Sequence, residues 1–160
     1  MANHVLKAEP ANYFVSPYFF ILYAEDFLAA SNTHDPSRAF SPVEYYLACH
    51  SIELSLKAFL LLRGVSKDEI GKKYLGHNLE NILEKCLDLG IVELVEIAEA
   101  EKALIAQLND WYSSKGFEYF EIKNIIANPK KLPEVGLSQE LAQKLIENLR
   151  EPCKDEANKP

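Results

Sequence analysis

Apolar residues recur every three to four positions along most of this chain, which is the spacing that places them on one face of an α-helix. They predict helices over about 16–30, 42–63, 79–89, 91–112 and 138–150. Clusters of Ser, Asn, Asp, Pro and Gly separate these segments and indicate loops. The pattern therefore predicts an all-α fold.

The helix predicted over 42–63 has the clearest ends. Ser41 is suited to cap its first turn, Pro42 to occupy the first position, and Glu44 to complete a capping box. At the other end, Gly64 is suited to the left-handed conformation that closes many helices. We expect this helix to lie at the centre of the fold.

Weaker signals mark the later segments. Asn78 and Ser138 are expected to cap the helices that begin after them. Between 113 and 136 the helical pattern stops, because residues 117–121 alternate briefly as in a strand and several prolines indicate loops. The course of 113–136 is therefore left open.

Length and composition indicate one domain over 1–150, followed by a disordered polar tail over 151–160. Hydrophobic residues make up 48% of the 160 residues and charged residues 26%, as in ordinary globular proteins. The net charge of −7 argues against a broad nucleic-acid-binding surface. No apolar segment is long enough for a membrane span and the first residues do not resemble a signal peptide, so we expect a cytoplasmic protein.

The cysteines indicate neither a metal centre nor a disulfide framework. They are three, far apart, and none has the CxxC spacing of zinc sites. Cys49 and Cys86 lie on apolar helical faces and are expected in the core, whereas Cys153 is expected as a surface thiol of the tail. We predict no metal and no cofactor, and the glycine-rich phosphate loops are also absent.

One narrow polar stripe interrupts the apolar helix over 42–63. His50, Glu53 and Lys57 fall within about 60° of one another at 3.6 residues per turn. Glu53 and Lys57 also have the i, i+4 spacing and the order that favour an ion pair. Charged residues are seldom placed in such a helix unless they are paired or used, so the stripe is the candidate site.

These residues also carry a family resemblance. The stretch Glu53-Leu-Ser-Leu-Lys57, then Gly64, then Gly76-His-Asn-Leu79 opening the next helix resembles the HEPN domain family, over roughly 14–119. The resemblance implies an up-and-down bundle of four to five helices, a homodimer, and a nucleotidyltransferase as a partner protein. It adds His77 to the candidate residues.

Many HEPN proteins are ribonucleases whose signature is an arginine, a polar residue, and a histidine that follows the arginine after four to six residues. This chain departs from that signature. More than ten residues separate Arg38 from His50, and Arg63 from His77, and no histidine follows Arg150. We therefore expect a non-catalytic member of the family that acts as a dimeric binding module.

Two interpretations of His50, Glu53, Lys57 and His77 remain open. In the first they are structural: Glu53 and Lys57 pair, and the histidines satisfy neighbouring groups. In the second they form a pocket for a small anionic ligand such as a nucleotide phosphate, where Lys57 supplies charge, His77 a donor, and Glu53 orients both. The alternative to a binding module is a divergent ribonuclease that uses His50 or His77 as general acid–base.

Overall fold

The computed structural model describes residues 16–36, 40–119 and 132–158. In this part of the chain there are six α-helices, one short 3₁₀ helix and no strand, which confirms the predicted all-α class. The helices are α1 (Pro17–Thr33), α2 (Pro42–Leu62), α3 (Lys67–Ile70), α4 (Leu79–Asp88), α5 (Glu99–Tyr112) and α7 (Val135–Ala157), and the 3₁₀ helix η1 spans Ile91–Glu93. None of these helices is long and apolar enough to cross a membrane.

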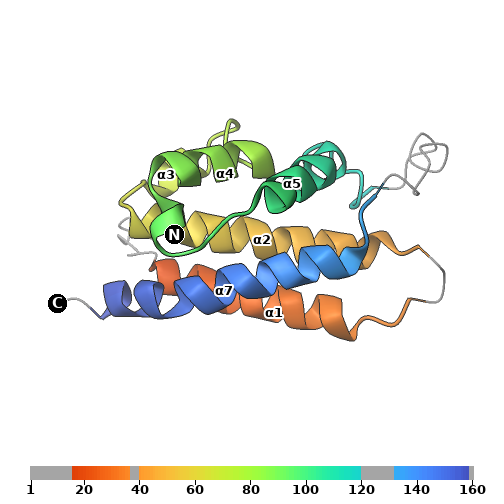
Figure 1. Ribbon diagram of the computed structural model, residues 1–160, viewed down its shortest axis with the longest axis horizontal. Coiled ribbons are helices and arrows are strands. Elements are labelled where there is room, and N and C mark those ends of the chain that lie inside the picture. Colours follow the sequence, from red (N-terminus) through yellow and green to blue (C-terminus); the bar gives the residue numbers. More distant parts are fainter. Residues whose placement is uncertain (1–15, 37–39, 120–131, 159–160) are drawn as a thin grey trace, which may run out of the picture.

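Helix α2 lies at the centre, as predicted. Helices α1 and α7 pack along one side of it, and α3, α4 and α5 lie along the other (Figure 1). Most of α2 from Ala48 to Leu60 is therefore buried, including the predicted core residue Cys49. An apolar helix with contacts on both sides is what a nearly continuous apolar circumference requires.

The predicted ends of α2 are confirmed in their main features. The Ser41 hydroxyl accepts from the backbone N–H of Val43 at 3.3 Å, rather than from Glu44 as the expected capping box requires. At the C-terminal end Gly64 has φ +82°, and the backbone N–H of Val65 donates to the carbonyl of Leu60 at 2.9 Å. A left-handed residue followed by a bond back into the last turn closes the helix.

The helix predicted over 91–112 is wrong in its first part. Only η1 forms there, an irregular segment follows, and α5 begins at Glu99. Val95 and Ile97 are buried within the irregular segment, so their apolar spacing reflects packing and not helix. The Glu101 carboxylate accepts from the backbone N–H of Ala98 at 2.7 Å and starts α5 there.

Helix α7 differs from its prediction at both ends. It begins at Val135, so Ser138 lies inside the first turns, fully buried, and is not the cap. It also continues to Ala157, so the prediction of a disordered tail over 151–160 is wrong for its helical part. Cys153 is fully buried there, and burial raises the pKa of its thiol to about 12, so it is not a surface thiol.

The remaining predictions concern the capping of α4 and the segment 113–136. The Asn78 side chain accepts from the backbone N–H of Asn81 at 3.0 Å, which confirms the predicted N-cap. Residues 117 and 118 lie in a turn, and the rest of the strand-like alternation over 117–121 lies mostly outside the described residues.

Candidate functional site

The predicted polar stripe lies where α2 meets the start of α4 and the end of α5. Glu53 is at its centre, with a side chain only 3% exposed. Lys57 comes from the next turn of α2, His77 from the loop before α4, and Tyr112 from the last turn of α5. Together with His50 of α2 these five residues are called the Glu53 cluster below.

Lys57 is held inside the fold. Its ammonium donates to Glu53 Oε1 at 2.6 Å and to the backbone carbonyl of Gly76 at 2.6 Å. The first bond neutralises the buried carboxylate, and the second fastens the loop before α4 onto α2. Lys57 therefore has a structural role, as the first of the two interpretations expects.

The other carboxylate oxygen collects two further groups. Glu53 Oε2 accepts from the Tyr112 hydroxyl at 2.6 Å and lies 3.0 Å from His77 Nδ1. Because all these partners come from different elements, Glu53 joins α2, the loop and α5 at one point. Unlike the rest of the cluster, His77 is substantially exposed, at 48% of its side chain.

His50 enters the cluster through the tyrosine. Its Nδ1 lies 2.8 Å from the Tyr112 hydroxyl oxygen and 3.9 Å from Glu53 Oε2. Its ring meets the edge of Phe27 from α1, with centroids 4.4 Å apart, and stacks against Tyr46, with centroids 5.7 Å apart. The His50 imidazole is thus oriented by aromatic packing on one side and by a polar contact on the other.

The electrostatics of the cluster follow from burial and pairing. Burial by itself raises the pKa of Glu53, but the Lys57 charge and the hydrogen bonds from Lys57, Tyr112 and His77 outweigh it and hold the pKa of the carboxyl below its ordinary value. Burial, and then the Glu53 charge, raise the pKa of Tyr112, so this hydroxyl keeps its proton. Burial also lowers the pKa of His50, although the Glu53 charge opposes this effect. The lowered pKa favours a neutral ring.

The structure brings all four predicted residues together, and it adds Tyr112, which the sequence did not single out. Tyr112 shares a face of α5 with Asn109. The Asn109 side chain accepts from the backbone N–H of Leu79 at 2.8 Å and donates to Glu80 at 2.8 Å. Asn109 thereby fixes α5 against the start of α4, next to His77. The spacing of three residues places Asn109 and Tyr112 on one face of a helix, but nothing in the sequence indicates that this face meets Glu53.

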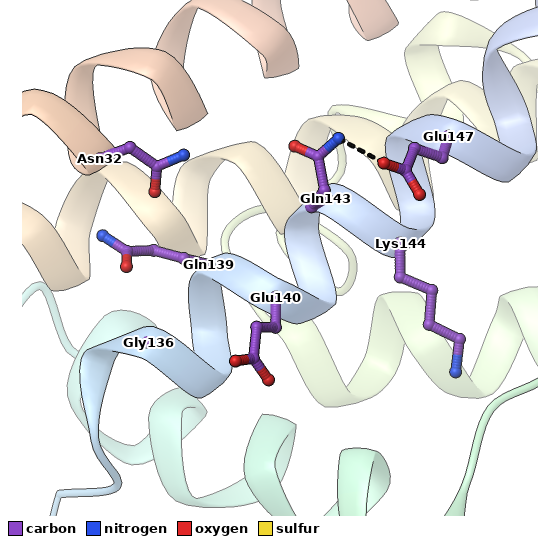
Figure 2. Close-up of a pocket in the computed structure, with 7 residues that line it drawn as sticks. All are labelled: Asn32, Gly136, Gln139, Glu140, Gln143, Lys144 and Glu147. Carbon is purple, nitrogen blue, oxygen red and sulfur yellow. Dashed lines mark hydrogen bonds between the residues drawn. The ribbon is translucent and has the colours of Figure 1, made fainter.

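A separate hollow lies between α7 and the end of α1 (Figure 2). It has a volume of about 420 Å³ and shares no residue with the Glu53 cluster. The Gln139 side chain donates to Ser31 Oγ of α1 at 3.0 Å, and the Gln143 side chain donates to Glu147 at 2.7 Å (Figure 2 shows the second bond). The residues that line this hollow are Asn32, Gly136, Gln139, Glu140, Gln143, Lys144 and Glu147.

Chemically, the Glu53 cluster combines a compensated buried charge with one exposed and one half-buried imidazole. Within the described residues no three His, Cys, Asp or Glu side chains are placed to hold a metal ion. No protein-family model matches the chain, and no match was found among curated proteins or solved structures. The geometry of the cluster is accordingly the basis for the functional proposal.

Proposed function

We propose that this chain is a non-catalytic HEPN-like helical module that binds a small phosphate-bearing ligand, such as a nucleotide, beside His77 and His50. One observation carries the proposal: the buried Glu53 carboxylate holds Nδ1 of His77 at 3.0 Å while the His77 side chain stays 48% exposed. A buried carboxylate that orients an exposed imidazole provides a fixed polar group at the surface.

The roles within the cluster differ from those expected from the stripe alone. Lys57 and Glu53 position the other groups, because both bonds of the Lys57 ammonium go to the protein interior. His77 contacts the ligand, and His50 provides a second imidazole next to it. Tyr46, which stacks on His50 and is partly exposed, offers a ring face for the base of a nucleotide.

The fold and assembly belong to the same proposal. The order of the long helices, with α1, α2 and α7 packed against one another and α4 and α5 on the opposite side of α2, supports an up-and-down HEPN-like bundle. Phe19 and Tyr23, one turn apart on α1, are 56% and 62% exposed and supply an apolar surface for a homodimer. A nucleotidyltransferase is the partner protein that the HEPN resemblance suggests.

The ligand site is tested by isothermal titration calorimetry with AMP on the wild type, on His77→Ala, and on Tyr74→Ala. Tyr74 is a matched control because it lies in the same loop and is 60% exposed. We expect His77→Ala to weaken AMP binding about tenfold or more, the effect of losing a polar contact to a charged group, whereas Tyr74→Ala binds as the wild type does. Absence of AMP binding by the wild type, or equal binding by His77→Ala, contradicts the proposal.

A divergent ribonuclease is the second candidate, and the contact between His77 and Glu53 favours it. A carboxylate on Nδ1 orients an imidazole for general acid–base chemistry at Nε2. Under this alternative the wild type cleaves a structured RNA, and His77→Ala and His50→Ala abolish the cleavage. The binding-module proposal predicts that none of the three proteins cleaves it.

A further inference from the structure

The hydrogen bonds of Tyr112 determine where the proton of His50 lies. The hydroxyl has one proton and touches two atoms, Glu53 Oε2 at 2.6 Å and His50 Nδ1 at 2.8 Å. An ionised carboxylate can only accept, so the Tyr112 proton points to Glu53 and the Tyr112 oxygen is left to accept. His50 Nδ1 must then carry the hydrogen of the second bond.

The same reasoning applies to His77. Its Nδ1 lies 3.0 Å from Glu53 Oε2, an atom that cannot donate, so His77 Nδ1 also carries a hydrogen. A neutral imidazole has one N–H, and whenever either ring is neutral these contacts place that hydrogen on Nδ1. Nε2 of each neutral ring is therefore a hydrogen-bond acceptor.

Nε2 of neither ring has a hydrogen-bond partner among the residues that the structure describes. The one buried side-chain polar atom without a partner in this part of the chain is Ser138 Oγ, and the His50 side chain is 19% exposed. His77 is the most exposed member of the cluster.

The surrounding charges do not favour an anion by themselves. Lys57 and Glu53 compensate each other at 2.6 Å, and Glu118, which lies near His50 and Tyr46, adds negative charge. From α1 the group that meets His50 is the apolar Phe27. With both rings neutral, an oxyanion without a proton would thus face two lone pairs and no uncompensated cation.

From this arrangement we infer that the site selects an anion that brings its own proton: the monoanion of a phosphate monoester, whose P–OH donates to Nε2 of His77 or His50. This inference rests on the proposed function and names the ionic form of its ligand. The proton either stays on the phosphate oxygen or moves to Nε2. In both cases the complex holds one more proton than the free protein and the phosphate dianion together.

Methyl phosphate and methyl sulfate provide a matched pair of probes. The methyl phosphate monoanion and methyl sulfate have the same charge and nearly the same shape, but only the former has a P–OH. At pH 7 we expect methyl sulfate to bind about tenfold or more weakly than methyl phosphate, because a site built to accept a hydrogen bond rejects an analogue that lacks the donor. Equal binding of the two probes would overturn the inference, since it would show that a histidine Nε2 already carries a hydrogen.

Calorimetry also counts the proton. The second pKa of a phosphate monoester is about 6, so at pH 8 the dianion predominates and binding should take up one proton per methyl phosphate. The uptake is measured by repeating the titration in two buffers of different ionisation enthalpy. Binding without proton uptake contradicts the inference. If neither probe and no AMP binds, the proposed function itself fails.

A ligand-free measurement separates the two failures. Long-range ¹H–¹⁵N NMR spectra of the protein without ligand should show both rings with the hydrogen on Nδ1. A hydrogen on Nε2 of either ring overturns the inference even where methyl phosphate binds. In Tyr112→Phe the acceptor for His50 is lost, so we expect the His50 hydrogen to shift toward Nε2 while His77 is unchanged. Tyr46→Phe is the control, because Tyr46 stacks on His50 without a hydrogen bond between them.

Discussion

Replacing Lys57 by Met tests whether the buried ion pair holds the cluster together. The substitution keeps most of the aliphatic stem and removes the ammonium, which donates to Glu53 Oε1 and to the Gly76 carbonyl, both at 2.6 Å. The carboxylate is then left buried, at 3% exposure, without its counter-charge. Removing one partner of a buried pair costs about 3–5 kcal/mol.

The assay is thermal and urea unfolding followed by circular dichroism. A loss of 3–5 kcal/mol corresponds to a fall in Tm of about 6–20 °C, because 1 kcal/mol shifts the Tm of a domain of this size by about 2–4 °C. Lys102→Met is the matched control. Lys102 pairs with Glu99 at 2.6 Å on the surface, where the Glu99 side chain is 88% exposed. Such a surface pair contributes about 0–1 kcal/mol.

A double variant separates the cost of an unpaired charge from the value of the pair. Glu53→Met combined with Lys57→Leu removes both charges, and replacing a whole buried pair by apolar residues is often nearly neutral. We expect it to be more stable than Lys57→Met alone. A loss below about 1 kcal/mol for Lys57→Met, as at a surface pair, would refute the assignment of Lys57 as a buried structural cation.

Three further predictions concern stability. Burial lowers the pKa of His50 from 6.5, so the unfolded chain binds a proton at higher pH than the folded one. The free energy of unfolding should therefore fall as the pH drops below about 6.5. In urea unfolding at a series of pH values, His50→Gln should reduce this dependence. Ser138→Ala removes a buried hydroxyl without a partner and should leave the free energy of unfolding unchanged or higher, whereas Ser51→Ala, which loses a 2.7 Å bond to the Ala24 carbonyl, should cost about 1 kcal/mol. Gly64→Ala, at φ +82°, should cost about 1–2 kcal/mol in the same assay, and Gly136→Ala, with no heavy atom within 4 Å of a new Cβ, should cost far less. The corresponding prediction is contradicted if Gly64→Ala is as stable as the wild type, if Ser138→Ala is destabilised, or if His50→Gln leaves the pH dependence unchanged.

The sequence predicts α2 well because local chemistry determines its ends. A Ser before a Pro starts the helix and Gly64 closes it, and neither depends on the rest of the fold. The i, i+4 pair of Glu53 and Lys57 is equally local. The contact of His77 with Glu53 could not be derived from helix periodicity, because His77 lies in the loop before α4.

The errors arise where tertiary packing overrides a local pattern. Val95 and Ile97 lie in the part that was predicted as helix, but they pack into the core from an irregular segment. Pro152 and the charged residues around it suggested a tail, yet α7 continues past them, because Cys153 is buried and continues an apolar row with Leu145 and Leu149. A row with spacing of four residues was visible in the sequence once Cys is counted as apolar.

Tyr112 could not be assigned to the cluster from the sequence. Its hydroxyl reaches Glu53 because α5 packs against the start of α4, where the Asn109 side chain accepts from the backbone N–H of Leu79. This packing depends on contacts between residues far apart in the chain. The proton position of His50 depends on Tyr112 in turn, and that of His77 depends on Glu53, so the chemistry of the site becomes visible only in the folded structure.

The most direct test of the proposed ligand site is a titration of ¹⁵N-labelled protein with AMP, followed through the imidazole and backbone amide signals. We predict saturable shifts of the His77 and His50 rings, with His34, which bonds to Ser41 elsewhere in the fold, unchanged. Shifts confined to the hollow around Asn32 and Gln143, or no saturable shift at all, would contradict the assignment of the Glu53 cluster as the binding site.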